Sequence, residues 1–184
     1  MKMTEFDSKS ISFIQKMAVL TEYTYDLTDS RDHVLDFVEQ NFTDVHALNG
    51  DSGLQYVWAR DASTGQIALS FAGFNGLDDI EAVGGTAYGG YPLSDSQVAA
   101  AITVFHGLVA QNPGTKINIV GHSQGGVNAQ AIAHYVDLLG LFGQSPSGLN
   151  LGSVLTLNAP GVGDNAGVAS EIALGFFDLV SDVA

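Results

Sequence analysis

Residues 117–126, INIVGHSQGG, constrain the fold more than any other part of the sequence. A short run rich in β-branched side chains leads into Gly121, and a helical pattern begins at Gln124. Gly121 and Gly125 flank Ser123 at the spacing G-x-S-x-G, so the chain can turn sharply there without a Cβ collision. The sequence therefore predicts a strand, a tight turn and a helix in succession, with the Ser123 hydroxyl raised clear of the sheet.

Helical and β-type segments alternate on both sides of this junction. We expect a helix at residues 94–111, a strand at 116–120, a helix at 124–139, a strand at 153–157 and a helix at 165–180. Such alternation is typical of parallel strands joined by crossover helices. The predicted fold class is α/β, a three-layer sheet with crossover helices.

The first half of the chain has a different pattern. Apolar residues recur at helical spacing over 10–25 and 31–40. Two β-type runs follow at 54–58 and 67–71, and the turn between them contains Gly65, which predicts a hairpin. Residues 72–93 are rich in glycine and have no firm period, so they are either a functional cover or a surface loop.

Composition narrows the classes of function. The 184 residues hold 6 basic and 20 acidic side chains, a net charge of −14, which disfavours nucleic-acid binding. The absence of cysteine removes disulfide frameworks, thiolate zinc sites and cysteine nucleophiles. We expect one domain over residues 1–184, with no cofactor, no metal and no stable membrane insertion. No signal peptide is readable, so the chain is cytoplasmic or leaves the cell without one, and its oligomeric state stays open.

The Gly-His-Ser-Gln-Gly junction resembles the nucleophile elbow of the α/β-hydrolases, in particular of the class 3 lipases. Three further segments are similar to that family: the predicted hairpin YVWARDASTGQIALSFAG, the following Phe71–Phe74, and LNAPG after the last predicted strand. The resemblance implies a serine hydrolase that cleaves lipid or other acyl esters through an acyl-serine intermediate. It assigns the nucleophile to Ser123 and the oxyanion donors to the backbone N–H groups of Gln124 and Phe74. Ala72 stands where the family has arginine, and Phe74 where it has a hydroxyl residue.

A catalytic serine needs a base, and α/β-hydrolases place an acid and then a histidine after the serine. The only histidine after Ser123 is His134, about 16 Å along the predicted helix, too far to take its proton. Asp164 follows a strand at the expected edge, as a catalytic acid or as a helix N-cap. We therefore expect these residues to be the N-terminal part of a longer lipase-like protein whose acid and histidine follow Ala184.

Three alternatives stay open. The turn around Ser123 could serve structure alone. The chain could also be a degenerate hydrolase that binds a lipid or a protein partner, or a serine peptidase or thioesterase on the same fold.

Overall fold

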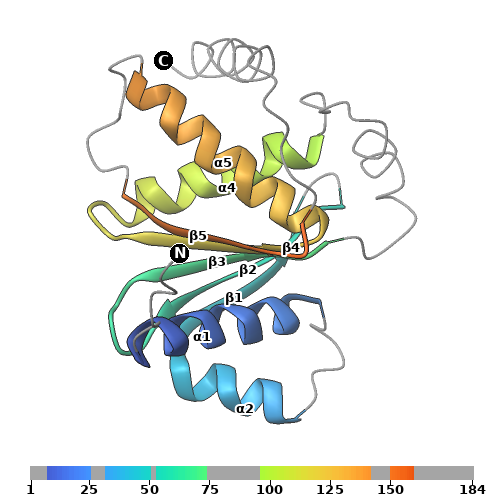
Figure 1. Cartoon of the computed structure of the whole chain (residues 1–184), viewed down its shortest axis with the longest axis vertical. Helices are drawn as coiled ribbons and strands as arrows, with labels where there is room; N and C mark the ends of the chain where they lie inside the picture. Colours follow the sequence, from blue (N-terminus) through green and yellow to red (C-terminus); the bar gives the residue numbers. More distant parts are fainter. Residues whose placement is uncertain (1–7, 26–31, 51–52, 74–95, 142–149, 160–184) are drawn as a thin grey trace, which may run out of the picture.

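The computed structural model describes residues 8–25, 32–50, 53–73, 96–141 and 150–159, and these form one sheet between two layers of helices (Figure 1). The elements in chain order are α1 (Ser8–Tyr25), α2 (Asp32–Asn41), β1 (Phe42–Asn49), β2 (Gln55–Asp61), β3 (Ile67–Phe71), α4 (Ser96–Gln111), β4 (Ile117–His122), α5 (Gln124–Leu141) and β5 (Leu151–Leu157). The three-layer α/β class predicted from the alternation is confirmed.

The five strands follow one another across the sheet in the order β1-β2-β3-β4-β5. The first two pairs, β1 with β2 and β2 with β3, are antiparallel, which confirms the predicted hairpin. The pairs β3 with β4 and β4 with β5 are parallel, and α4 and α5 are the crossover connections. Parallel strands joined in this way end at the same edge of the sheet, so β3, β4 and β5 deliver their last residues to one place.

Alternate side chains of the central strands point into two separate cores. Ile67, Leu69 and Phe71 of β3 pack with residues of α4 and α5, such as Phe105 and Ile132. The opposite face, which includes Ala68 of β3 and Val120 of β4, packs against α1 and α2 through Met17, Leu20 and Val38. A period of two along a strand covered by helices on both faces explains why every residue of β3 is buried.

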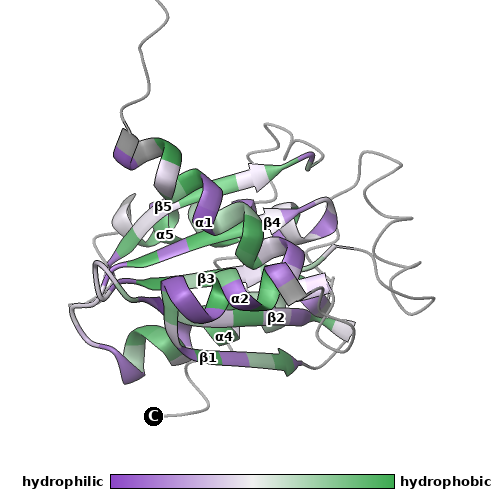
Figure 2. Ribbon diagram, turned by 90° about the horizontal axis from the view of Figure 1, so that it is seen from below, coloured by the Kyte–Doolittle hydropathy of each residue, from purple (hydrophilic) through white to green (hydrophobic). Residues whose placement is uncertain are grey.

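Helices α1 and α2 carry hydrophobic residues on only part of their surface. Figure 2 shows green and purple segments alternating around α1 and α2. This distribution is typical of helices with one covered side and one solvent side. No helix among the described residues is long and apolar enough to cross a bilayer.

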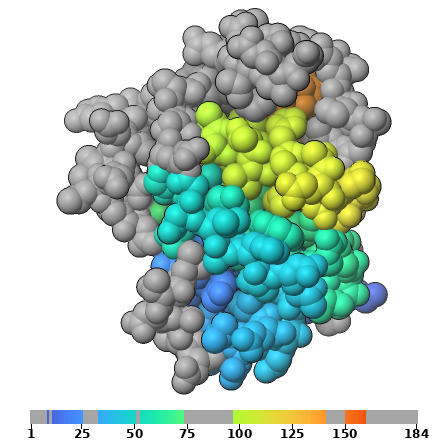
Figure 3. All heavy atoms as spheres, turned by 180° about the vertical axis from the view of Figure 1, so that it is seen from behind, coloured from blue at the N-terminus to red at the C-terminus, as the bar shows by residue number. Residues whose placement is uncertain are grey.

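Strand β1 was not predicted from the sequence. Its residues are mostly exposed, and only Phe42 is buried, because β1 is the edge of the sheet. Figure 3 shows the light-blue atoms of this part of the chain at the surface. An edge strand exposed in this way has no alternation of apolar and polar residues to reveal it. The predicted helix at 165–180 and most of the glycine-rich segment 72–93 lie outside the described residues.

Candidate functional site

Ser123 is the single residue between strand β4 and helix α5. Its φ is 52°, in the left-handed region that costs a residue with a side chain about 1–2 kcal/mol. Two hydrogen bonds hold this conformation: the Ser123 N–H donates to the Leu157 carbonyl at 3.0 Å, and its carbonyl accepts from the Gly126 N–H at 3.0 Å. The strained turn is therefore fixed from one side by β5 and from the other by α5.

Close backbone packing explains the two glycines of the junction. A Cβ on Gly121 would overlap the carbonyl group of Gly125. A Cβ on Gly125 would overlap the carbonyl oxygens of Phe71 and Ala72, at the end of β3. Three segments thus meet backbone to backbone, and a side chain at either glycine would force the start of α5 away from the sheet.

The chain that leaves β3 also reaches Ser123. A Cβ placed on Gly73 would lie 2.9 Å from the Ser123 Cβ and 2.8 Å from the His122 carbonyl oxygen. Gly73 is the last described residue before Phe74, so Phe74 itself lies outside the description. The segment after β3 thus approaches Ser123 at Gly73, and the role expected for Phe74 stays a prediction.

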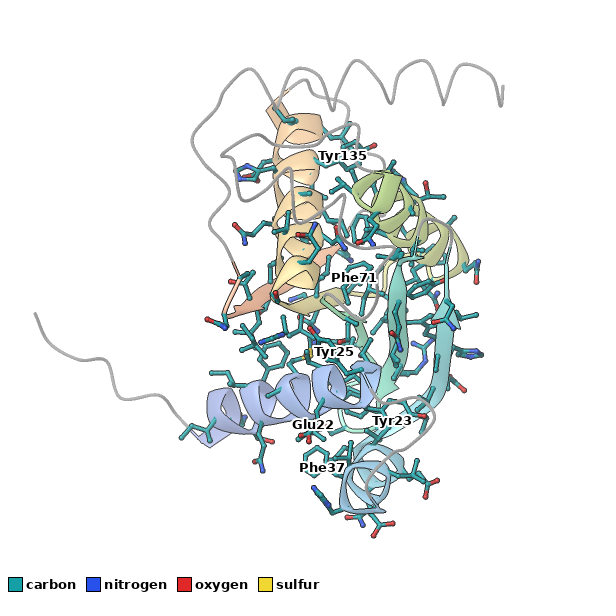
Figure 4. The ribbon with its side chains drawn as sticks, turned by 90° about the vertical axis from the view of Figure 1, so that its right-hand side faces the viewer. Glu22, Tyr23, Tyr25, Phe37, Phe71 and Tyr135 are labelled. Atoms are coloured by element: carbon teal, nitrogen blue, oxygen red, sulfur yellow. The ribbon has the colours of Figure 1, made fainter. Side chains whose placement is uncertain are left out.

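Tyr25, at the end of α1, contacts both the segment after β3 and the end of β4. Its hydroxyl accepts a hydrogen bond from the Gly73 N–H at 2.6 Å and lies 2.8 Å from Nδ1 of His122. The Tyr25 and His122 rings meet edge to face, with centroids 5.6 Å apart. Figure 4 shows Tyr25 pointing from the end of α1 towards the sheet. Sequence reasoning assigned this tyrosine no role, and the only signal was its position at the end of a helix.

Two buried amide side chains follow Ser123 on the first turns of α5. Gln124 is 4% exposed, and its Nε2 has no hydrogen-bond partner among the described residues. Asn128 is fully buried, and in the same part of the chain neither its Nδ2 nor its Oδ1 finds a partner. Unpaired buried amides cost about 1–3 kcal/mol each and are rare away from strained or functional sites.

The five histidines of the chain do not provide an obvious base for Ser123. His33 is exposed on α2, and His134 is exposed on α5, about three turns from Ser123. His46, on the edge strand, stacks on Trp58 with centroids 4.2 Å apart. His122 adjoins Ser123, but its Nδ1 faces Tyr25.

His106 links α4 and α5, the two helices that cover the face of the sheet opposite α1 and α2. Its Nε2 lies 2.8 Å from the Tyr135 hydroxyl, which connects α4 to α5. Burial lowers the pKa of His106 and raises the pKa of Tyr135, so both groups are held in their neutral forms at pH 7. The pair is a structural contact of the core, away from the turn at Ser123.

No protein-family model and no curated protein matches the sequence. Among solved structures, the chain is similar to a fungal lipase in complex with an inhibitor, with a TM-score of 0.57 and 21% identity over 91% of this chain and 69% of the lipase. With the triacylglyceride lipase of Rhizomucor miehei the TM-score is 0.55 and the identity 22%, over 91% of this chain and 69% of the lipase. With the Lip2 lipase of Yarrowia lipolytica the TM-score is 0.54 and the identity 19%, over 93% of this chain and 65% of the lipase.

The share of each lipase that is covered bears on what the comparison means. A propeptide complex of the Rhizomucor miehei lipase is covered over only 59% of its length. The chain therefore spans about three fifths to two thirds of the lipases that it matches. At this level of identity, the likeness extends to the backbone arrangement: the chain has the α/β-hydrolase fold of the fungal class 3 lipases.

Proposed function

We propose that this chain provides the nucleophile and the oxyanion donors of a carboxylic ester hydrolase, with Ser123 as the nucleophile. The observation that carries the proposal is the left-handed φ of Ser123 between β4 and α5. Strain of this kind persists only where the surrounding structure imposes it, and it raises the hydroxyl at the edge where the parallel strands end. A turn that served structure alone would accept glycine there and relieve the strain.

The proposed reaction is acyl transfer in two steps. The Ser123 hydroxyl oxygen attacks the ester carbonyl carbon, its proton passes to a base, and the C–O bond to the alcohol breaks as the alcohol takes a proton. Water then attacks the acyl-serine, which releases the carboxylic acid and restores the serine. Because the fold neighbours include a triacylglyceride lipase, we propose a lipid ester as the substrate.

Negative charge on the carbonyl oxygen would be held by the backbone N–H groups of Gln124 and Phe74. Gln124 begins α5, and the first N–H groups of a helix have no acceptor within it. The close approach of Gly73 to Ser123, where a Cβ on Gly73 would lie 2.9 Å from the Ser123 Cβ, supports a place for the Phe74 N–H beside the serine. The Tyr25 hydroxyl, which accepts from the Gly73 N–H, would hold this segment in position.

The proposed base is a histidine outside these 184 residues. His33, His46 and His106 lie on α2, β1 and α4, and His134 lies about three turns along α5 from Ser123. Nδ1 of His122 faces the Tyr25 hydroxyl. The nucleophile and the oxyanion donors would thus come from this chain, and the base would come from another segment.

The test compares this chain with the product of the whole gene on p-nitrophenyl butyrate, each with and without Ser123→Ala. We expect the whole product to hydrolyse the ester at least about a thousandfold faster than its Ser123→Ala variant, because the variant keeps only oxyanion binding. The 184-residue chain should show no turnover that depends on Ser123. If the whole product is neither active nor labelled at Ser123 by a fluorophosphonate, the hydrolase proposal is wrong.

The same experiment decides on a second candidate, a lipid- or partner-binding module with the same fold. The five histidine positions favour it, since none of them is placed to activate Ser123. A module of this kind would leave Ser123 unlabelled in the whole product. Turnover by the 184-residue chain that is lost in Ser123→Ala would contradict both the module and the external base, and would point to a base within the chain.

A further inference from the structure

A pocket of about 420 Å³ lies at the other end of the central strands from Ser123. It is lined by residues at the start of β3 and β4, such as Ile67 and Asn118, and by one side of α1. Strand rise places it about 15–20 Å from the turn at Ser123. Its volume is in the range of sites that hold small molecules.

One face of α1 forms a wall of this pocket. Lys9, Ser12, Phe13, Lys16 and Met17 all line it, at the spacing i, i+3, i+4, i+7, i+8 that places residues on one side of a helix. The wall therefore carries two lysines, a serine and the two apolar side chains Phe13 and Met17.

Of the two lysines that line the pocket, only Lys16 pairs with a carboxylate of the described residues. Asp61, the one acid among the described residues of the lining, accepts a hydrogen bond from Lys16 Nζ at 2.8 Å and from the N–H groups of Ser63 and Thr64, and is 15% exposed. Lys9 is exposed and has no ion-pair partner among the described residues. In a chain of net charge −14 with six basic residues, two of them line this one pocket, and no carboxylate of the described residues pairs with Lys9.

Apolar side chains close the interior. Met17, Phe42, Ile67 and Ala68 line the pocket but are each no more than 3% exposed, so they offer a ligand almost no surface. Phe13, which also lines the pocket, is partly exposed. A ligand would therefore meet the cation of Lys9 and the apolar ring of Phe13. Neither a strongly charged nor a wholly apolar molecule is complementary to both the lysine and the apolar side chain.

We propose that this pocket binds a small amphipathic carboxylate, with the carboxylate at Lys9 and the hydrocarbon chain against Phe13, beside Met17 on the same face of α1. The proposal does not depend on the role of Ser123, because no residue of the turn lines the pocket. It assigns the chain a second, non-catalytic ligand site on the opposite edge of the sheet.

Octanoate is a suitable probe, and Met17 is a built-in reporter because the chain has only three methionines. The Ser123→Ala chain, labelled with ¹³C on the methionine methyl groups, is titrated with octanoate and, separately, with octan-1-ol. We expect the Met17 methyl signal to shift saturably with octanoate and to respond more weakly to the alcohol. The Met17 signal is assigned by its loss in Met17→Leu.

Two lysine variants give the decisive comparison. Lys9→Gln should weaken octanoate binding about threefold to tenfold, the range for a partly exposed charge pair. Lys116→Gln changes the net charge equally, but Lys116 does not line the pocket, so the affinity should change less than about twofold. Both lysines are exposed, so neither change threatens the fold.

Three results would overturn the proposal: no Met17 shift at octanoate concentrations of about 10 mM, equal affinity for octanoate and octan-1-ol, or equal effects of the two lysine variants. Because the titration is made with Ser123→Ala, each of these results is independent of whether Ser123 is a nucleophile.

Discussion

The two ends of strands β3 and β4 are built in different ways. At the end that leads into Ser123, backbone meets backbone: Gly121 and Gly125 leave no room for a Cβ, and a Cβ on Gly73 would overlap the serine. At the other end, side chains make the connections, with Lys16 bound to Asp61 and Asn118 donating to Gln66, around a pocket of about 420 Å³. The first end has almost no tolerance for a change of shape, whereas the second can lose a polar pair and keep its architecture.

This contrast explains where a reaction and where a ligand would be accommodated. A strained serine needs neighbours that cannot move, and backbone packing supplies them. A binding pocket needs free volume, which the side-chain end keeps between α1 and the start of the sheet.

The largest expected effect tests the backbone end. Gly125→Ala should lower the free energy of unfolding by at least about 3 kcal/mol, because the new methyl group would overlap two carbonyl oxygens that cannot move independently of β3. Urea unfolding followed by the fluorescence of Trp58, the only tryptophan, measures this loss.

Gly140→Ala is the matched control for that change. Gly140 is also in α5, and a Cβ there meets nothing within 4 Å. We expect a gain of about 0.5–1 kcal/mol from better helix propensity. Equal losses in the two variants would show that the difference between the ends does not come from close packing.

A smaller loss is expected from Tyr25→Phe, which removes one hydroxyl and leaves the ring. The Gly73 N–H then has no acceptor in Tyr25, and His122 Nδ1 loses the same partner, which should cost about 1–2 kcal/mol in urea unfolding. Tyr23→Phe is the control, because no hydrogen bond of the Tyr23 hydroxyl is found among the described residues, and should change the stability by less than about 0.5 kcal/mol. If the two variants lose the same stability, Tyr25 does not hold the Gly73 segment.

At the pocket end of the strands, we expect the contribution of Asp61 to stability to depend on pH. Partial burial raises the pKa of the Asp61 carboxyl, but hydrogen bonds from Lys16, Ser63 and Thr64 outweigh this effect and lower the pKa from 3.8 to about 2. A pKa that is lower in the folded state stabilises the protein above pH 3.8, and this stabilisation disappears as the pH falls from about 4 to about 2.

Asp61→Asn should therefore cost about 1–2 kcal/mol at pH 7, after allowance for solvent screening, and close to nothing near pH 2. The difference in unfolding free energy between the wild type and the variant, measured at both pH values, isolates this carboxyl from the others. Asp44→Asn is the control, since Asp44 is 60% exposed and its contact with Arg60 is 3.3 Å long, and we expect it to cost no more than about 0.5 kcal/mol. A pH-independent cost of Asp61→Asn would contradict the assignment.

Much of the fold could be predicted from local pattern. Strands β2, β3, β4 and β5 and helices α1, α2, α4 and α5 were predicted within a few residues, because each has a covered side that repeats at its own period. Strand β1 was missed because an exposed edge strand has no such repeat. Helix α5 ends at Leu141, two residues beyond the prediction, and helix ends commonly differ by this much. Residues 94 and 95, the predicted start of α4, lie outside the described residues.

The candidate site was only partly predictable. Gly121, Ser123 and Gly125 are local, and their spacing indicated the turn. Tyr25 is nearly a hundred residues away in sequence from His122, and nothing in the residues around it indicates that its hydroxyl reaches the turn. The roles of Gln124 and Phe74 as oxyanion donors stay predictions.

The order of residues in the chain determined the strand, the sharp turn at Ser123 and the helix after it, because steric limits on φ and ψ and the repeat of apolar side chains act over a few neighbours. Only the tertiary structure decided that Gly73, Tyr25 and His122 meet at that turn, and that Lys9, Phe42 and Asp61 surround one pocket. These groups come from elements far apart in the sequence. They are brought together by the burial of apolar area on both faces of one sheet, which is a property of the whole chain and of no single segment.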